Sequence, residues 1–156
     1  MIKNLKNGFT LIELLVVISI IGVLAALVVV NYSSARIRAR DVARKSDLAQ
    51  IKRALRLYYN DNNAYPDAIT FGDLWETVDE KMTYMRLIPN DPLEGVSYQY
   101  FAGSVACSDG INDFRLVAVL ENKSDAEAAQ SQFRCGTDCG YDSGDYDNDQ
   151  YVVCAD

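Results

Sequence analysis

The sequence is dominated by a long apolar run near its N-terminus. Residues 14–30 are apolar except for Ser19 and Gly22, and residues 14–35 carry no charge. A helix over residues 9–30 would be about 33 Å long at about 1.5 Å per residue, which matches the hydrocarbon core of a bilayer. The pattern therefore predicts a transmembrane and assembly helix over residues 9–35.

Residues 36–62 continue this helix with a different pattern. Neither Pro nor Gly occurs there. Apolar side chains recur at spacings of three and four along one side of the predicted helix: Leu48, Ile51, Leu55 and Tyr58. We therefore predict an amphipathic continuation that rests its apolar side on a globular part. Joined to the first run, it forms one helix over residues 10–61, about 78 Å long.

The remaining residues, 63–156, predict a small globular head. Turn-forming residues at 61–66 end the long helix. A capping-box pattern that starts at Thr70 predicts a short helix over residues 71–80, and Ser124 opens a helical turn. Alternating apolar positions predict three strands, separated by loops such as that at 88–95: residues 96–102, 114–120 and 151–154. One long helix packed on a small antiparallel sheet gives an α+β fold.

The charges are unevenly distributed along the chain. It has 156 residues with 15 Lys or Arg, 22 Asp or Glu and no His, a net charge of −7. Residues 36–56 hold eight Lys or Arg and two Asp, whereas residues 57–156 hold five Lys or Arg and 19 Asp or Glu. The acidic part would repel phosphate, and no aromatic residues interleave with the basic ones, which argues against a nucleic-acid partner. We predict that the basic residues form a solvated helix face or meet the acidic heads of other copies.

The composition also argues against catalysis. The absence of His excludes Ser-His-Asp and Cys-His mechanisms and every His-ligated metal site. The carboxylates of the C-terminal segment lie in a polar stretch with no apolar pocket to raise the pKa of one of them, as glycosidase chemistry requires. We therefore predict that the chain is not an enzyme.

The four cysteines all lie in the predicted head: Cys107, Cys135, Cys139 and Cys154. Their spacing lacks the paired C-x2-C segments typical of zinc sites, which favours two disulfides over a zinc centre with four cysteine ligands. Four cysteines allow three pairings, and the sequence does not choose among them. Disulfides suit an oxidising compartment and would hold the C-terminal segment on the sheet.

The acidic C-terminal loop is a candidate cation site. Asp145, Asp147 and Asp149 occupy alternate positions, and Asp156 falls at the twelfth position of a loop that starts at Asp145. Hard oxygen ligands at this spacing suit Ca2+, as in an EF-hand-like loop. Gln150 replaces the Gly that an EF-hand has at its sixth position, so we expect no true EF-hand. A calcium site at these four carboxylates and a solvated acidic turn both remain open.

The first turn of the apolar helix carries one carboxylate, Glu13. Thr10 and Glu13 form the S/T-x-x-E capping-box pattern, and the helix dipole favours an anion at this position. A capping role explains why an acid is tolerated next to a membrane segment, where charge is costly. A secretory signal peptide is an alternative, with Lys3 and Lys6 as its basic start, but the apolar run exceeds the usual length of about 7–15 residues.

The residues around Glu13 resemble the class III signal of type IV pilins and type II secretion pseudopilins. The matching stretch is Gly8-Phe9-Thr10-Leu11-Ile12-Glu13-Leu14-Leu15-Val16-Val17, after a short leader that contains Lys. The resemblance implies a type IV pilin-like fold and a leader peptide at residues 1–8. A prepilin peptidase would cut after Gly8 and methylate the new N-terminus at Phe9. During assembly, Glu13 would pair with the α-amino group of Phe9 in a neighbouring subunit.

Later segments are similar to the major pseudopilins. They include Ala54-Leu55, Tyr58, Asp61-Asn62 and Tyr65-Pro66 at the end of the long helix, and Ile88-Pro89 and Asp91-Pro92 before the sheet. These pseudopilins also carry calcium in a C-terminal loop, which favours Ca2+ at the acidic loop by resemblance alone. Two features depart from the family pattern. Val30 stands where many members have a proline that loosens the helix, and the Cys-rich tail is not a constant of the family.

The resemblance implies a structural subunit of a type IV pilus-like filament, a helical homopolymer built by an assembly ATPase and its platform. Before assembly, the chain would lie in the cytoplasmic membrane with a single pass and its head outside. The filament would then be on the cell surface or in the periplasm. The alternatives are a major pseudopilin of a type II secretion system, and a membrane-anchored extracellular binding protein that does not assemble.

The predicted orientation conflicts with one rule. Five basic residues just past the apolar run outnumber Lys3 and Lys6: Arg36, Arg38, Arg40, Arg44 and Lys45. The positive-inside rule taken alone would place the head in the cytoplasm. The leader resemblance and the cysteines outweigh that rule, so we predict that the head lies outside.

Overall fold

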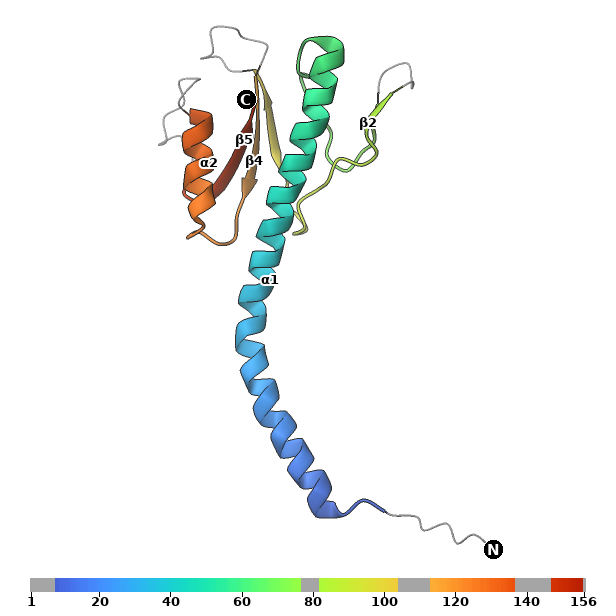
Figure 1. Ribbon diagram of the computed structural model, residues 1–156, viewed down its shortest axis with the longest axis vertical. Coiled ribbons are helices and arrows are strands. Elements are labelled where there is room, and N and C mark those ends of the chain that lie inside the picture. The colour runs from blue at the N-terminus through green and yellow to red at the C-terminus, as the bar shows by residue number, and fades with distance from the viewer. Residues whose placement is uncertain (1–7, 77–81, 104–112, 137–146, 156) are drawn as a thin grey trace, which may run out of the picture. The chain divides into compact units, whose positions relative to one another are not determined.

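The computed structural model describes residues 8–76, 82–103, 113–136 and 147–155, and at residues 27–31 and 136 it describes the backbone alone. Two helices and five strands are present in this part of the chain (Figure 1). In chain order they are α1 (Leu11–Asn62), β1 (Trp75–Glu76), β2 (Thr83–Met85), β3 (Gln99–Ala102), β4 (Phe114–Val119), α2 (Ala126–Gly136) and β5 (Gln150–Cys154). The chain divides into two compact units, Met1–Arg36 and Ile37–Asp156.

α1 confirms the single helix predicted over residues 10–61. It ends where Asn63 adopts a positive φ of 54° and its N–H donates to the carbonyl of Tyr59 at 2.7 Å. Asn is one of the few residues that tolerate this left-handed backbone after a helix. Its apolar half was predicted to cross a membrane; among the described residues, no helix combines the length and the apolarity that a bilayer span requires.

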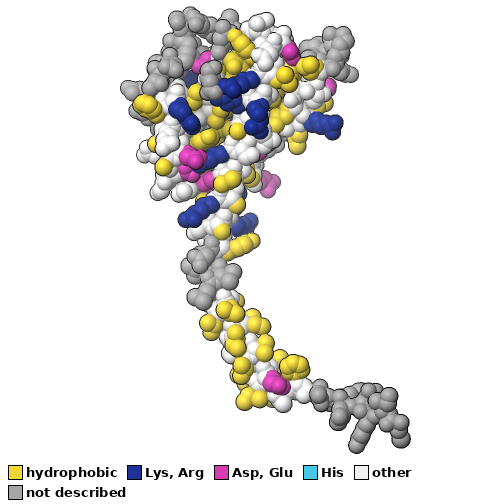
Figure 2. All heavy atoms as spheres, viewed as in Figure 1, with side chains coloured by type: hydrophobic (Ala, Val, Ile, Leu, Met, Phe, Trp, Pro, Cys, Tyr) yellow, Lys and Arg dark blue, Asp and Glu magenta, His cyan; other side chains and the backbone are white. Residues whose placement is uncertain are grey.

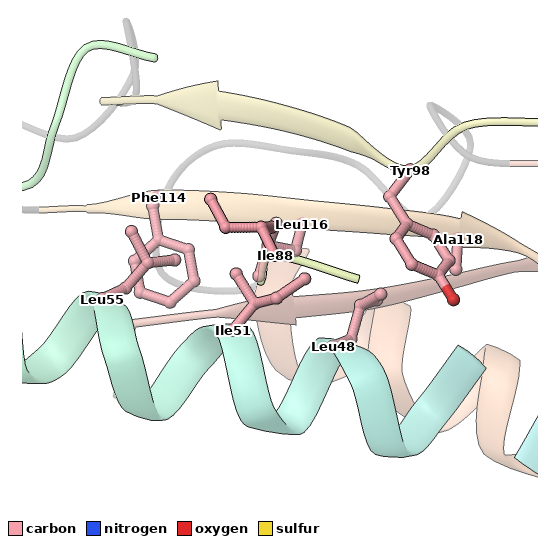
Figure 3. Close-up of a cluster of buried hydrophobic side chains, with 8 residues drawn as sticks. All are labelled: Leu48, Ile51, Leu55, Ile88, Tyr98, Phe114, Leu116 and Ala118. Atoms are coloured by element: carbon pink, nitrogen blue, oxygen red, sulfur yellow. The ribbon is translucent and has the colours of Figure 1, made fainter. Parts of the chain in front are cut away.

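The core of the head lies between α1 and the larger sheet. Leu48, Ile51 and Leu55, predicted to form the apolar side of the helix, are completely buried at 0% exposure. They form one cluster with Ile88, Tyr98, Phe114, Leu116 and Ala118 (Figure 3). Complete burial of a Leu, Ile or Phe side chain is worth about 1.5–3 kcal/mol relative to exposure. This cluster therefore holds the second half of α1 on the head.

Two antiparallel sheets make up the rest of the head. β1 pairs with β2, and the larger sheet has the strand order β3-β4-β5. The residues of β4 alternate: Phe114 and Leu116 belong to the cluster under α1, while Val117 packs with Cys135 and Val152. α1 and α2 therefore cover opposite faces of the central strand, as Figure 1 shows. The α+β architecture predicted from the sequence is confirmed.

The strand predictions hold with shifted ends. The strands predicted over 114–120 and 151–154 correspond to β4 and β5. β3 begins at Gln99 instead of residue 96, because the N–H of Val96 donates to the carbonyl of Leu93 at 3.2 Å in a turn. The helical turn predicted after Ser124 extends into the 11 residues of α2.

The short helix predicted over residues 71–80 is wrong where the structure describes it. Trp75–Glu76 forms β1, and residues 77–80 lie outside the described part. The N–H of Gly72 donates to the carbonyl of Ile88 at 2.7 Å, and the N–H of Ile88 donates to the carbonyl of Asp73 at 2.9 Å. The Trp75 ring also stacks on Tyr58 of α1, with ring centres 5.4 Å apart. These distant contacts hold the backbone extended and override the local capping-box pattern.

Candidate assembly site

The predicted processing and assembly residues, Gly8, Phe9 and Glu13, lie together at the start of α1. The Phe9 side chain is 85% exposed. Oε2 of Glu13 accepts hydrogen bonds from the N–H of Thr10 at 2.9 Å and from its hydroxyl at 2.8 Å. The N–H of Glu13 donates to the Thr10 hydroxyl oxygen at 3.3 Å. The predicted capping box is therefore complete, and it holds the carboxylate at the positive end of the helix dipole.

The first half of α1 presents an extended apolar surface. From Phe9 to Leu24, its large apolar side chains keep 46–85% of their surface exposed. They appear as the yellow stretch along the helix in Figure 2. An apolar surface of this extent is unfavourable in water and marks a contact with lipid or with other apolar helices. The unit Met1–Arg36 is therefore built for insertion or assembly.

The second half of α1 is tied to the head by a buried ion cluster that sequence analysis missed. Arg44, 1% exposed, donates to both carboxylate oxygens of Asp91 at 2.7 and 2.9 Å. The same guanidinium donates to Asp41 at 2.7 Å and to Glu121 at 2.9 Å. Asp41 also accepts the N–H groups of Glu121 and Asn122, each at 2.9 Å. The only sequence signal was the i, i+3 spacing of Asp41 and Arg44.

Two further basic residues of α1 pair with acids of the same head. Arg40 Nε donates to Glu121 at 2.6 Å, and Lys45 Nζ donates to Asp125 at 2.7 Å and to Glu127 at 2.9 Å. The hydrogen bond from Arg40 is the largest reason why the pKa of Glu121 is lowered from 4.5 to about 2. The hydrogen bond from Lys45 likewise lowers the pKa of Asp125. These basic residues therefore face their own head, where a solvated helix face or a contact with other copies had been predicted.

One disulfide is described, between Cys135 of α2 and Cys154 of β5. Their Cα atoms lie 5.7 Å apart. Cys107 and Cys139 lie outside the described residues. The bond selects one of the pairs left open by the sequence, and it uses two of the four thiols that a zinc centre with four cysteine ligands would need. It holds the last strand against the second helix.

The predicted calcium ligands are only partly described. Asp147 and Asp149 lie in the turn before β5, whereas Asp145 and Asp156 lie outside the described residues. Asp149 Oδ2 lies 3.3 Å from Nζ of Lys123. In the part of the chain that is described, no three Cys, Asp or Glu side chains converge as a metal site would require.

A residue that the sequence did not single out, Gln132 of α2, positions this acidic turn. Its side chain is buried, and Nε2 donates to the carbonyl oxygens of Asp147 and Gln150 at 2.8 and 2.7 Å. The neighbouring Ser131 hydroxyl accepts the N–H of Val152 at 3.0 Å. α2 therefore satisfies backbone groups at the outer edge of β5, where an unpaired strand would otherwise invite pairing with another chain.

Comparison with known proteins agrees with this arrangement. Residues 3–29 match the prokaryotic N-terminal methylation motif. The chain is 38% identical over 109 residues to the type II secretion system core protein G of Pseudomonas aeruginosa, which covers 64% of this chain and 76% of that protein. It is 40% identical over 90 residues to core protein G of Escherichia coli K12, covering 58% and 60% of the two chains.

A pilus protein is also among the relatives. The chain is 46% identical over 63 residues to the type IV wide pilus major component of Thermus thermophilus, covering 40% of this chain and 47% of that one. No solved structure matches the chain. The methylation motif contains Gly8, Phe9 and Glu13, and the head has the α+β fold expected of a pilin-like subunit. By its motif, its fold and these relatives, the chain belongs to the family of the type II secretion system core protein G.

Proposed function

We propose that the chain is a structural subunit of a type IV pilus-like filament, processed by a prepilin peptidase and assembled through its N-terminal helix. The observation that carries the proposal is the first turn of α1. There an exposed aromatic residue, Phe9, precedes the exposed apolar half of α1. Glu13 is the only acidic residue in positions 9–35 and is held at the helix start. The match to the methylation motif over residues 3–29 supports the same reading.

Cleavage after Gly8 would change the chemistry of this turn. It converts the Phe9 amide nitrogen into an α-amino group, which is largely protonated at neutral pH because its ordinary pKa is about 8. An ionised carboxylate between apolar helices is costly unless a cation accompanies it. The α-amino group of Phe9 in a neighbouring copy supplies that cation. Pairing it with Glu13 would set the axial register of adjacent subunits.

The apolar helix would serve two environments in turn. The run over residues 14–30 suits the bilayer in which the subunit is stored, with the head outside. It equally suits the interior of a bundle of identical helices. Because both surroundings are apolar, transfer from the membrane to the filament changes the hydrophobic free energy little. The assembly ATPase and its platform would supply the work of extraction.

Two variants of Glu13 test the pairing. Glu13→Gln keeps the capping box, since Gln also serves at this position, but removes the charge. We expect it to insert into membranes normally and to enter filaments poorly, as Glu13→Ala should. Thr10→Val weakens the cap and keeps the charge, so it is the matched control and should assemble better than either. The measurement is the amount of subunit in the membrane fraction and in sheared filaments. Normal incorporation of Glu13→Gln would contradict the pairing.

Mass spectrometry of the purified chain tests the processing. The proposed mature form lacks residues 1–8, begins with N-methylated Phe9 and gains mass on reduction of its disulfides. A mature N-terminus elsewhere, for example near residue 35, would contradict the filament proposal. It would favour a membrane-anchored binding protein that does not assemble.

A second candidate function is a major pseudopilin of a type II secretion system. Relatives named core protein G of such systems favour it. Electron microscopy of sheared surface material separates the two: a pilus subunit gives long surface fibres. A pseudopilin leaves the surface bare, and its deletion blocks export of secreted proteins.

Calcium at the acidic loop is a separate proposal. Asp147 and Asp149 offer the carboxylate oxygens that Ca2+ prefers. Asp145 and Asp156 stand at the first and twelfth positions of the same EF-hand-like loop and would be the other two ligands. The partner of Asp149, Lys123, has a side chain that is 79% exposed, so a cation could displace it. Adding Ca2+ to the full chain should raise its Tm, and Asp147→Asn with Asp149→Asn should remove the effect. An unchanged Tm would favour a solvated acidic turn.

A further inference from the structure

An aromatic residue and a cation lie one helical turn apart just past the apolar run of α1. Tyr32 is 60% exposed, and Arg36, four residues later, is also exposed. The guanidinium carbon of Arg36 lies over the Tyr32 ring, 5.7 Å from its centre. Both residues belong to the unit Met1–Arg36. A contact with the face of an aromatic ring leaves the N–H groups of a guanidinium free to donate to an anion.

The positive charge of Arg36 is not used within the described part of the chain. Residues 14–40 contain no Asp or Glu. The next acid, Asp41, already accepts hydrogen bonds from Arg44 and from two backbone N–H groups of the head. The ion pairs found among the described residues use other basic residues, and none of them uses Arg36. Its guanidinium is therefore available to an anion from outside the chain.

The place of this pair along the helix matches the headgroup layer of a bilayer. The apolar run ends at Val30, so Tyr32 lies about 3 Å and Arg36 about 9 Å beyond it along the helix axis. Side chains of a helix lean toward its N-terminus, and the contact with Tyr32 shows that Arg36 reaches back in this direction. The polar layer of a leaflet is about 5–8 Å thick. With the apolar run in the bilayer, the guanidinium is therefore at the level of the lipid phosphates.

We infer that Tyr32 and Arg36 bind the headgroup of an anionic phospholipid while the subunit is stored in the membrane. The inference rests on the proposed function, since it names a lipid contact of the stored subunit. Arg36 donates N–H groups to the phosphate oxygens, whose geometry the planar fork of a guanidinium matches. The Tyr32 ring supports the guanidinium at the interface, where Tyr is enriched in membrane proteins. The contact fixes the outer end of the apolar helix at the membrane surface.

A phospholipid fits this site better than a soluble polyanion does. Residues 57–156 carry 19 Asp or Glu against five Lys or Arg, and this acidic head would repel a polynucleotide. A phospholipid is instead held at the required depth by its own acyl chains, and anionic lipids attract basic residues next to a membrane segment. The residues between Tyr32 and Arg36 are Ser33, Ser34 and Ala35, which are small and exposed, so they leave room for a headgroup.

Native mass spectrometry of the full chain in detergent micelles tests the contact. Dioleoyl-phosphatidylglycerol and dioleoyl-phosphatidylcholine are added in equal amounts, and the ratio of protein that retains each lipid is measured. Arg36→Gln should lower the preference for phosphatidylglycerol about fivefold, the effect expected for one basic residue at an anionic surface. Arg36→Lys keeps the charge without the fork and should lower the preference less. Arg53→Gln, which removes an exposed cation from the head, is the matched control and should leave the ratio unchanged.

Two further arms test the aromatic partner and the source of the phosphate. Tyr32→Leu keeps an apolar side chain but removes the ring under the guanidinium, so its ratio should lie between those of the unaltered chain and Arg36→Gln. Excess glycerol phosphate or a single-stranded oligonucleotide should not displace phosphatidylglycerol, because neither is anchored at this depth. An unchanged ratio in Arg36→Gln or in Tyr32→Leu would overturn the inference. Displacement by either soluble anion would overturn the assignment to a lipid.

Cell fractionation separates failure of this inference from failure of the proposed function. Thermal unfolding of each full-length variant in detergent should show a folded head, since Tyr32 and Arg36 are exposed side chains outside its core. If the unaltered chain is absent from the membrane fraction and forms no filaments, the proposed function fails. If it inserts and assembles but Arg36→Gln retains the full preference for phosphatidylglycerol, only the lipid contact fails.

Discussion

Arg44 is the centre of the buried ion cluster that ties α1 to the head. Its planar guanidinium has five donors, and the structure uses them on three carboxylates: Asp41, Asp91 and Glu121. Two of these acids are, like the arginine, buried. A lysine has the charge but not the fork geometry, so it could not serve the same set.

Replacing Arg44 by Met should therefore destabilise the head severely. The substitution leaves the buried carboxylates of Asp41 and Asp91 without their cation, and breaking a buried pair in this way typically costs about 3–5 kcal/mol. Urea unfolding of the full chain in detergent measures the change. Lys123→Met, which removes an exposed ion pair, is the control and should cost about 1 kcal/mol or less. A similar small loss for Arg44→Met would contradict the importance of the cluster.

Glu121 predicts how the head responds to acid. Its pKa is lowered from 4.5 to about 2, first through the hydrogen bond from Arg40. A carboxyl whose pKa is lower in the folded state stabilises the fold fully above its unfolded pKa and loses that contribution as the pH falls toward its folded pKa. The Tm should therefore fall between about pH 4.5 and about pH 2. Glu121→Gln should have a lower Tm at neutral pH and a flatter profile in this window. If Tm fell with pH equally in the unaltered chain and in Glu121→Gln, Glu121 would not be the source of the acid sensitivity.

The helices and strands were predictable where the pattern was local and long. Apolar residues three and four positions apart predict α1, and apolar residues at alternate positions predict β4 and β5. β1 was not predictable, because Trp75 stacks on Tyr58 and pairs with Met85, both of which are distant in sequence. Backbone hydrogen bonds that join Gly72 and Asp73 to Ile88 hold the preceding turn. Distance along the chain also explains why the motif at the start of α1 was predictable and the ion cluster around Arg44 was not. Gly8, Phe9 and Glu13 form one contiguous motif, whereas Asp91 is 47 residues from Arg44.

The disulfide between α2 and β5 should be worth about 3 kcal/mol, the value expected for closing a loop of this length. Cys135→Ala with Cys154→Ala should lower the free energy of unfolding by that amount. Amide exchange at β5 should also speed up, because Ser131 and Gln132 alone would then hold its outer edge. Denaturant unfolding and hydrogen exchange of the full chain check both effects. An unchanged exchange rate at Val152 would show that the disulfide does not hold this strand.

The whole chain combines two units with opposite solvent requirements. Ile37–Asp156 contains the buried cluster under α1, and the described ion pairs all lie within it. Met1–Arg36 exposes its apolar side chains and contains none of the described core. The first unit therefore depends on lipid or on other copies, whereas the second has what it needs to fold in water.

Residues 37–156 expressed alone should give a soluble, folded head. The fragment retains Leu48, Ile51 and Leu55 together with the Arg44 cluster, so its cooperative unfolding should resemble that of the head in the full chain. Circular dichroism and thermal unfolding under oxidising conditions measure this. The same fragment with Arg44→Met is the control and should unfold at a lower temperature. A fragment without a cooperative transition would show that the head needs the first unit.

The sequence alone predicted an assembly end at the start of α1 and the α+β class of the head, and the structure confirms the α+β class. Capping at Thr10 and Glu13, the apolar run and the seam of α1 are local, so neighbouring residues specify them. The ion cluster around Arg44, the partner of Cys135 and the support of the acidic turn by Gln132 became visible only in the folded chain. Each depends on which distant residues the core brings together, and no local pattern contains that information.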